Sequence, residues 1–337
     1  MASEPIPPSP ESPVVISVEN LVKRYRAVEA VNDVSFAVRQ GEIFGFLGPN
    51  GAGKTTTISI LCTLLEPTAG VVRVAGHDVL RQRNDVRRSI GLVFQEPALD
   101  LKLTAEENLY LHARLYGVPA AAYRERLQEV LTLVELWERR RDRVETYSGG
   151  MKRRLEIARG LLHYPKVLFL DEPTLGLDPQ TRNHLWTYIL RLKREKGMTI
   201  FLTTHYMNEA EYCDRIGIID RGRLVSLDAP ARLKQSVGGD VVRLRSPAPA
   251  AALIGELRDR LGLVAVADDD AVRFETQDAN RHVPEILRSL AVPIDSIEIH
   301  KPTLDDVFLK LTGHALRDVQ DSAERVRQSF RGMGRRG

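Results

Sequence analysis

A glycine-rich segment near the start of the chain has the composition of a loop that binds phosphate. Residues 48–55 read GPNGAGKT, which fits the spacing G-x-x-x-x-G-K-[ST], between an apolar run at 42–47 and a segment of helical composition at 54–65. Glycines let backbone N–H groups converge on phosphate oxygens, and a following helix points its positive end at the same anion. A chance glycine-rich turn is the alternative, and the strand before the loop and the helix after it argue against that.

The spacing of this loop predicts specific roles for two of its side chains. Lys54 would reach the β- and γ-phosphates of a nucleotide, and the hydroxyl of Thr55 would hold Mg²⁺. The predicted nucleotide-binding residues of the loop are Gly48, Pro49, Asn50, Gly51, Ala52, Gly53, Lys54, Thr55 and Thr56.

Two carboxylates follow a short apolar run further along the chain. The run 167–170 reads VLFL and is followed at once by Asp171 and Glu172. In nucleotide hydrolases a strand-end Asp holds the Mg²⁺ shell, and the next Glu could orient and polarise the attacking water. Alone, this pair could equally be an acidic surface junction, because acidic residues are usually exposed. Together with the phosphate loop it predicts a P-loop nucleotide hydrolase and leaves the subclass open.

The apolar pattern predicts the elements that must position these residues. The runs 167–170 and 199–202 have the length of strands buried on both faces, and the gaps between strands carry helices, which favours parallel βαβ connections. Residues 104–160 are helical in pattern, and Thr104 with Glu107 forms a capping box. Strands are predicted at 14–18, 34–38, 42–47, 167–170, 199–202 and 216–220.

The subclass is indicated by residues 147–152, which read YSGGMK. They resemble the L-S-G-G-Q signature of the ABC ATPase family. Ser148 can cap the following helix, and Gly149 and Gly150 expose backbone donors at its positive end. The resemblance implies that this loop faces the nucleotide of another subunit, so that two ATP molecules are sandwiched in a head-to-tail dimer. Tyr147 replaces leucine and Met151 replaces glutamine, which could change packing or coupling around the loop.

Four further positions match the motifs of that family in order. The resemblance implies that Tyr25 stacks on adenine, that Gln95 touches Mg²⁺ or the attacking water, that Asp178 reaches across the dimer, and that His205 contacts the γ-phosphate. Tyr25 could instead be a half-buried strand tyrosine, and His205 a structural histidine. The implied catalytic residues are Lys54, Gln95, Glu172 and His205, and the implied metal ligands are Thr55, Gln95 and Asp171.

The end of the chain predicts a second, smaller module. Residues 241–299 suggest the order βαββαβ, which is typical of a ferredoxin-like unit. Residues 239–313, and above all KPTLDDVF at 301–308, resemble the accessory domain of daunorubicin/doxorubicin-resistance ABC exporters. The predicted elements are strands at 241–244, 263–266, 272–275 and 294–299 and helices at 250–261, 283–290 and 303–311.

The expected architecture is therefore an α/β P-loop ATPase followed by a small α+β domain. The 337 residues suit one large and one smaller domain. The predicted parts are a disordered tail at 1–13, an ABC ATPase domain at 14–236 with a helical subdomain at about 96–160, an accessory domain at 237–313 and an Arg-rich tail at 314–337.

Composition narrows the classes of partner. A net charge of +3 is too balanced to argue for nucleic acid. Cys62 and Cys213 have no spacing that suggests a metal site or a disulfide framework, which favours a reducing compartment. No apolar run approaches the ~20 residues that cross a bilayer. Any membrane process would be served through a partner.

The resemblance implies an ATPase that uses ATP and Mg²⁺ and lies peripherally at the cytoplasmic face of the cell membrane. Its partners would be a second copy and a polytopic permease, held near Gln95 and the helices of 104–136, with no nucleic acid. Hydrolysis, with Glu172 as general base, would energise export of a drug-like or lipophilic substrate. One alternative is an ABC ATPase that acts on ribosomes or nucleic acid, although such proteins usually carry two ATPase halves or long coiled coils. Another is a non-enzymatic nucleotide sensor, with which Glu172 and His205 conflict.

Overall fold

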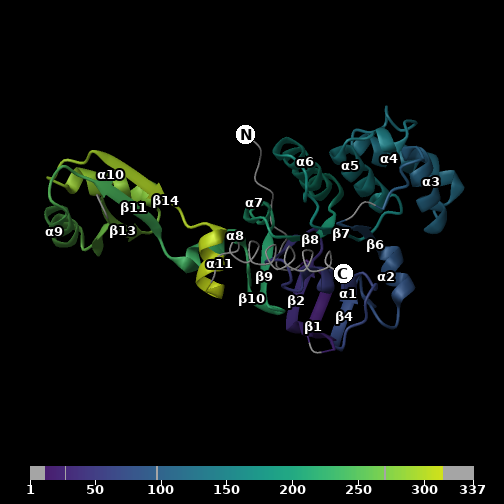
Figure 1. The fold of residues 1–337 in the computed structure, drawn as a ribbon, viewed down its shortest axis with the longest axis horizontal. Helices are drawn as coiled ribbons and strands as arrows, with labels where there is room; N and C mark the ends of the chain where they lie inside the picture. Colours follow the sequence, from purple (N-terminus) through teal and green to yellow (C-terminus); the bar gives the residue numbers. More distant parts are fainter. Residues whose placement is uncertain (1–11, 27, 96–97, 269–270, 314–337) are drawn as a thin grey trace, which may run out of the picture. The chain divides into compact units, whose positions relative to one another are not determined.

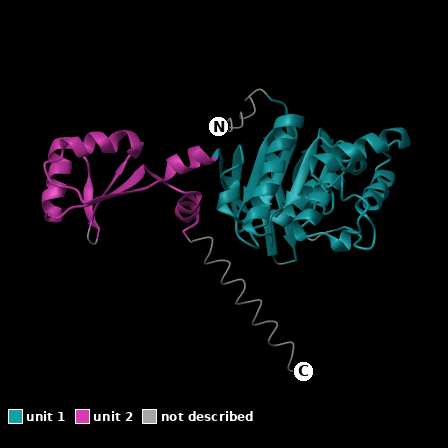
Figure 2. Cartoon of the chain, turned by 90° about the horizontal axis from the view of Figure 1, so that it is seen from above, with its two compact units in different colours: residues 1–229, 316–337 teal, residues 230–315 magenta. Residues whose placement is uncertain are grey.

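The computed structural model describes residues 12–26, 28–95, 98–268 and 271–313 (Figure 1). The tail expected at 314–337 and nearly all of that expected at 1–13 lie outside the described residues. The chain divides into two compact units, one ending at Ala229 and the next beginning at Pro230 (Figure 2). In the described ranges, no helix is long and apolar enough to cross a membrane.

A six-stranded sheet forms the centre of the first unit, in the order β10-β9-β3-β8-β7-β6. Neighbours from β9 to β6 run parallel and β10 joins as an antiparallel edge, so the predicted parallel connections are confirmed. Both faces are covered, which explains why β3, β7 and β8 are buried throughout. The strands are β3 Ile43–Leu47, β6 Ile90–Val93, β7 Val167–Asp171, β8 Thr199–Thr204, β9 Arg215–Asp220 and β10 Arg223–Asp228.

An antiparallel sheet in the order β2-β1-β4-β5 packs against the first one. Phe36 of β2 stacks on Phe44 of β3 with ring centroids 5.3 Å apart, and both side chains are buried. These rings join the two sheets in one apolar core. The strands are β1 Val14–Tyr25, β2 Val28–Arg39, β4 Ala69–Val74 and β5 His77–Asp78.

Three helices connect the strands of the first unit, and a short one follows β8. Helix α1 ends at Leu61 rather than at the predicted 65, because the chain turns into a left-handed conformation at Thr63. The longest helix of the described residues, α6, begins with Asp178 as N-cap and proline at its first position, and it ends at a left-handed glycine. The helices are α1 Lys54–Leu61, α2 Arg83–Ser89, α6 Pro179–Lys196 and α7 Met207–Ala210.

A helical subdomain is inserted between β6 and β7. It contains α3 Ala105–Leu115, α4 Ala120–Leu133, the 3-10 turn Val144–Thr146 and α5 Gly149–Leu161. The predicted capping box is confirmed, since Glu107 N donates to Thr104 Oγ1 over 3.2 Å and Thr104 N donates to the Glu107 carboxylate over 2.8 Å. Helix α5 returns to the sheet and crosses β6 where Gly91 meets Gly160. A Cβ at Gly91 would lie 2.3 Å from Gly160 O, so this close approach requires glycine.

The second unit contains an antiparallel sheet in the order β12-β13-β11-β14. Its elements follow as βαββαβ, which confirms the predicted ferredoxin-like arrangement. Helix α10 begins earlier than predicted, because Ala279 N donates to the Asp240 carboxylate over 2.8 Å and starts the helix there. The elements are β11 Asp240–Arg245, α9 Ala250–Leu261, β12 Ala265–Asp268, β13 Ala271–Thr276, α10 Ala279–Ser289 and β14 Ser296–His300.

Two further helices flank this sheet in the chain. Helices α8 (Pro230–Val237) and α11 (Leu304–Thr312) pack against each other inside the second unit. The segment 14–236 expected from the sequence for the ATPase domain includes most of α8. In the structure the division precedes α8, because the partner of its apolar face is α11.

Candidate nucleotide-hydrolysis site

The phosphate loop joins the carboxyl end of β3 to α1, as the sequence predicts. Two of its glycines are required by their surroundings. A Cβ at Gly48 would lie 2.2 Å from Ile219 O, and Gly53 combines a φ of +108° with a backbone oxygen, Ala30 O, 2.5 Å from where a Cβ would stand. The loop can therefore wrap closely around an anion only with glycine at both positions.

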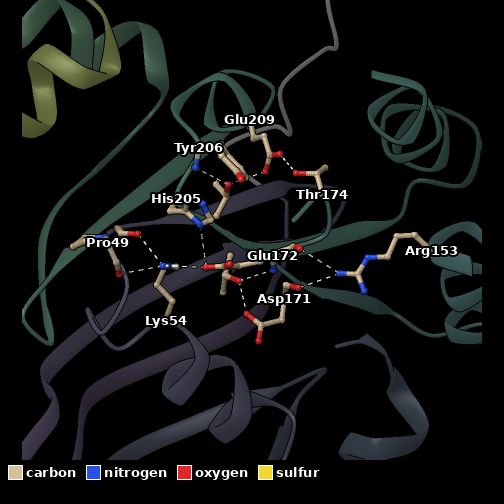
Figure 3. Close-up of polar contacts among 12 residues, drawn as sticks. Pro49, Lys54, Arg153, Asp171, Glu172, Thr174, His205, Tyr206 and Glu209 are labelled. Carbon is tan, nitrogen blue, oxygen red and sulfur yellow. Dashed lines mark hydrogen bonds and ion pairs between the residues drawn. The ribbon is translucent and has the colours of Figure 1, made fainter. Parts of the chain in front are cut away.

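Lys54 is held beneath the loop. Its side chain is only 4% exposed, and Nζ donates to Gly48 O over 2.8 Å and to Pro49 O over 3.1 Å (Figure 3). Burial lowers the pKa of Lys54, and the nearby Glu172 carboxylate opposes that shift. The ammonium group is thus fixed at the inner side of the loop, where phosphate oxygens would lie.

The two carboxylates at the end of β7 are organised by Thr203 of β8. Parallel pairing places Asp171 beside Thr203. Thr203 Oγ1 donates to Asp171 Oδ1 over 2.5 Å and accepts from Glu172 N over 3.0 Å. Burial raises the pKa of Asp171, and the Thr203 hydroxyl works against that rise. One hydroxyl group therefore orients both the candidate metal ligand and the backbone of the candidate base.

Glu172 lies at the centre of the charged groups. Its Oε1 is 3.3 Å from Lys54 Nζ and 3.3 Å from His205 Nδ1. Burial alone would raise the pKa of Glu172, but His205 and Lys54 outweigh it and lower the pKa. The side chain is therefore a carboxylate near neutral pH, as a general base requires. Its backbone has a φ of +44°, a left-handed conformation that is rare for glutamate.

These groups surround a cavity of about 500 Å³. It brings together the phosphate loop, Gln95, Glu172 and His205 from segments far apart in the chain. Mg²⁺ prefers oxygen ligands, and the hydroxyl of Thr55 and the carboxylate of Asp171 at this end of the sheet fit that preference. The lining residues are Ala30, Asn50, Gly51, Gly53, Lys54, Thr55, Thr56, Gln95, Glu172, Leu175, His205 and Tyr206.

Other predicted site residues lie outside this cavity. Ser148 and Gly150 line a separate hollow of about 280 Å³, where Ser148 caps α5 by accepting from Met151 N. Asp178 is exposed and caps α6 by accepting from Thr181 N over 3.0 Å. Tyr25 is 45% exposed at the end of β1. A single chain therefore gathers only part of the predicted set in one place.

Sequence reasoning missed a buried carboxylate behind His205. Glu209 of α7 accepts a hydrogen bond from the Thr174 hydroxyl and another, over 2.7 Å, from the Thr204 hydroxyl (Figure 3). Burial raises the pKa of Glu209. It connects the loop after Glu172 to the end of β8. No local motif marks it, because its partners come from two other segments.

Another hollow, of about 820 Å³, lies on the second unit. Arg243 is one of its lining residues, with Nε 2.9 Å from Asp268 Oδ2 and Nη1 3.3 Å from Glu298 Oε2. Since Arg243 is already paired with carboxylates, size alone does not make this hollow a phosphate site. The chemistry points to the smaller cavity at the phosphate loop.

Comparisons with known proteins decide the family. Residues 31–175 match the family model described as ABC transporter, and residues 229–312 match that of the C-terminal domain of DrrA1-3-like ATP-binding proteins. The chain is 38% identical to the linearmycin resistance ATP-binding protein LnrL of Bacillus subtilis (strain 168), over 90% of this chain and 100% of that protein. The chain belongs to the ABC transporter ATP-binding proteins.

Other members of the ABC transporter family also match the chain. The chain is 40% identical to the daunorubicin/doxorubicin resistance ATP-binding protein DrrA of Streptomyces peucetius, over 92% of this chain and 96% of that protein. A dimeric ATP-binding cassette in a post-hydrolysis state, bound to ADP and Pi, superposes with a TM-score of 0.58 at 29% identity, over 64% of this chain and 98% of that one. As a member of this family, the chain is an ATPase of the drug-resistance and export type, and it uses ATP and Mg²⁺. A further solved cassette, cbiO1 of Clostridium perfringens, is part of the ABC transporter complex cbiONQ and superposes with a TM-score of 0.62 at 26% identity, over 74% of this chain and 96% of that one.

Proposed function

We propose that this ABC ATPase energises the export of a drug-like or lipophilic substrate through a separate permease chain, with Glu172 as general base. The observation that carries the proposal is the position of the Glu172 carboxylate, 3.3 Å from both Lys54 Nζ and His205 Nδ1 at the phosphate loop. The substrate class is supported by relatives named for linearmycin and daunorubicin resistance, which match the chain over about nine-tenths of its length.

The reaction follows from the placement of this chain's own groups. Lys54 neutralises charge on the β- and γ-phosphates. Thr55 and Asp171 would hold Mg²⁺, which when bound would supply stabilisation of the negative charge on the phosphates. Glu172 takes a proton from the water whose oxygen bonds to the γ-phosphorus, and the bond from that phosphorus to the bridging oxygen of ADP breaks. His205 orients the Glu172 carboxylate, and Gln95 lines the space in which the water would lie.

The second hollow supports a head-to-tail homodimer. Ser148, Gly149 and Gly150 stand at the free N-terminus of α5, where backbone donors and the helix dipole favour an anion. They lie apart from the Lys54 cavity of their own chain, so they would complete the site of a second copy, with Asp178 and Tyr25 at its edges. ATP closes such a dimer only because it binds the closed state better than the open one.

Apolar side chains on the helical subdomain support a permease contact. Helix α3 exposes Tyr110, Leu111 and Leu115, and Leu115 is 83% exposed. Leu111 and Leu115 are one turn apart and share a helix face. Exposed apolar groups of this kind are typical of a surface that another protein covers. Such a contact would hold the chain peripherally at the membrane, and the resemblance to ABC ATPases implies its cytoplasmic face.

The test is affinity capture of a tagged Glu172→Gln variant from detergent-solubilised cells in ATP, with Lys54→Ala as the control that should not close around ATP. We expect Glu172→Gln to bind ATP, to remain dimeric, to lose about 10²- to 10⁴-fold in turnover, and to retain a polytopic membrane protein. Near-normal turnover would remove Glu172 from the role of base. Ribosomal proteins or nucleic acid without a membrane protein would favour the ribosome-directed alternative.

A further inference from the structure

Arg153, on the second turn of α5, is buried against the catalytic end of the sheet. Its side chain is 7% exposed and points toward Asp171 and Glu172 (Figure 3). Its partners are mostly backbone carbonyls, a use that the signature resemblance does not assign. Nε donates to Pro173 O over 2.8 Å, Nη1 donates to Phe94 O, and Nη2 donates to Asp171 O over 3.1 Å and Glu172 O over 3.4 Å.

A buried carboxylate completes this arrangement. Glu156, one turn further along α5, is fully buried and accepts from Arg153 Nη1 over 3.0 Å. It also accepts from Ala98 N over 2.8 Å. The Arg153–Glu156 pair is therefore bonded to the chain on both sides of Gln95, at Phe94 and at Ala98.

The geometry of the guanidinium group suits a positioning task. Its planar fork presents donors in fixed directions, so one side chain can hold several carbonyls in a fixed relation. The carbonyls that it holds belong to the strand end where Glu172 has a φ of +44°, a conformation that persists only when its surroundings enforce it. A bond to the backbone fixes where the Glu172 side chain starts, whatever the side chain itself contacts.

The N-terminal end of α5, about one turn before Arg153, bears the signature loop. Ser148 caps the helix, and Arg153 follows it on the same rigid element. If α5 turns, the carbonyls bonded to Arg153 must move with it or lose a charged hydrogen bond inside the protein. The energetic cost of leaving such a buried group unpaired makes joint movement the favoured outcome.

We propose that Arg153, held by Glu156, is a positioning residue that fixes Gln95 and the Glu172 carboxylate relative to α5. It thereby links the hydrolysis site of one copy to the signature loop that faces the other copy. This inference rests on the proposed roles of Glu172, Gln95 and Ser148. It assigns Arg153 an effect on the rate of hydrolysis rather than on the affinity for ATP.

The chain offers a matched control at the opposite end of the sheet. Arg215, at the start of β9, donates to Ala37 O over 2.7 Å and pairs with the fully buried Glu42. Arg215 thus makes the same kinds of bond as Arg153, to a backbone carbonyl and to a buried carboxylate. It lies at the amino ends of the parallel strands, whereas the phosphate loop lies at their carboxyl ends. Arg153→Gln and Arg215→Gln should both lower the thermal midpoint.

The experiment compares these variants in full-length protein by ATPase kinetics and by equilibrium binding of ATP to the folded fraction. For Arg153→Gln we expect kcat to fall about 10- to 100-fold while the Kd for ATP changes less than about 2-fold, because misplaced reacting groups slow the chemistry without removing ground-state contacts. Arg215→Gln should keep kcat. Arg153→Lys retains a positive charge opposite Glu156 but loses the planar guanidinium group. Its kcat should therefore lie between that of Arg153→Gln and that of the parent protein.

Three results would overturn the inference. They are an unchanged kcat in a folded Arg153→Gln or Arg153→Lys protein, a kcat loss no greater than that of Arg215→Gln, and a loss that lies wholly in the Kd. Adding Arg153→Gln to Glu172→Gln should slow the residual rate by less than about 3-fold, because both changes act on one group. Near-normal turnover of the single variant Glu172→Gln would instead refute the role of Glu172 as general base. That measurement uses a different variant protein, so the two failures can be told apart.

Discussion

Replacing Thr203 by valine should expose how strongly one buried hydroxyl supports the hydrolysis site. Thr203 is fully buried on β8, and valine has nearly the same shape, so the change removes the hydroxyl without opening a cavity. Its bond to the Asp171 carboxylate, 2.5 Å long, is charge-assisted and contributes about 1.5–3 kcal/mol. The bond from Glu172 N contributes less, because that N–H also donates to Thr203 O over 3.2 Å. We expect the free energy of unfolding to fall by about 2 kcal/mol in total.

The Thr203→Val substitution should also raise the Mg²⁺ requirement of the ATPase. Without the hydroxyl, the pKa of Asp171 should rise further, because burial already raises it and Thr203 is the main group that opposes the rise. Protons then compete better with Mg²⁺ for the carboxylate. The Mg²⁺ concentration that half-activates the ATPase should increase, and more so as the pH falls.

The assay pairs urea unfolding with Mg²⁺ titration of ATPase activity at saturating ATP. Thr203→Ser is the matched control, because it keeps the hydroxyl and removes a methyl group. Thr203→Ser should retain the Mg²⁺ requirement of the parent, whereas Thr203→Val should not. Equal unfolding free energies and equal Mg²⁺ requirements in the two variants would refute the role given to the hydroxyl.

Three other predictions concern glycine, helix capping and pH. Gly48→Ala should lose ATP binding and at least about 2 kcal/mol of stability in thermal unfolding, since its Cβ would lie 2.2 Å from Ile219 O. Gly149→Ala, whose Cβ would make only an ordinary contact of 3.9 Å with Leu177 Cδ2, should keep its stability. Ser148→Ala should cost about 1 kcal/mol through loss of the N-cap of α5, as measured by urea unfolding. Burial lowers the pKa of His112 from 6.5 to about 3, so the unfolded chain binds more protons between these values and stability should fall as the pH drops through that window. A His112→Gln variant should lose stability less steeply between about pH 7 and pH 5, and an unchanged slope of the urea midpoint would contradict this.

Much of the fold could be predicted from the sequence wherever the signal is local. The capping box at Thr104, the strand–loop–helix order around Lys54 and the βαββαβ order after Gly239 depend on neighbouring residues, and the structure bears them out. The strands β4 and β10 were missed, because they stand at or near sheet edges and their apolar alternation is weak.

The motifs of the candidate site could be predicted from the sequence, but the contacts between their side chains could not. Thr203 contacts Asp171 across 32 positions of sequence, and that pairing depends on strand register. Arg153 carries no local signal, because nothing nearby in the sequence reveals that its side chain is buried against carbonyls of other segments. Contacts of this kind arise from tertiary packing, which a single sequence does not encode locally.

The left-handed backbone at Glu172 has a consequence for how substitutions at this position change the stability of the protein. Glycine, asparagine and aspartate tolerate that conformation better than glutamate does, so a glycine at this position would relieve about 1 kcal/mol of strain or more. A glycine would also remove the carboxylate that lies 3.3 Å from the buried Lys54 ammonium group, and leaving a buried charge without its partner is strongly destabilising. The strain is therefore tolerated because the same side chain forms the ion pair of the hydrolysis site, so backbone strain and charge pairing oppose each other at this position.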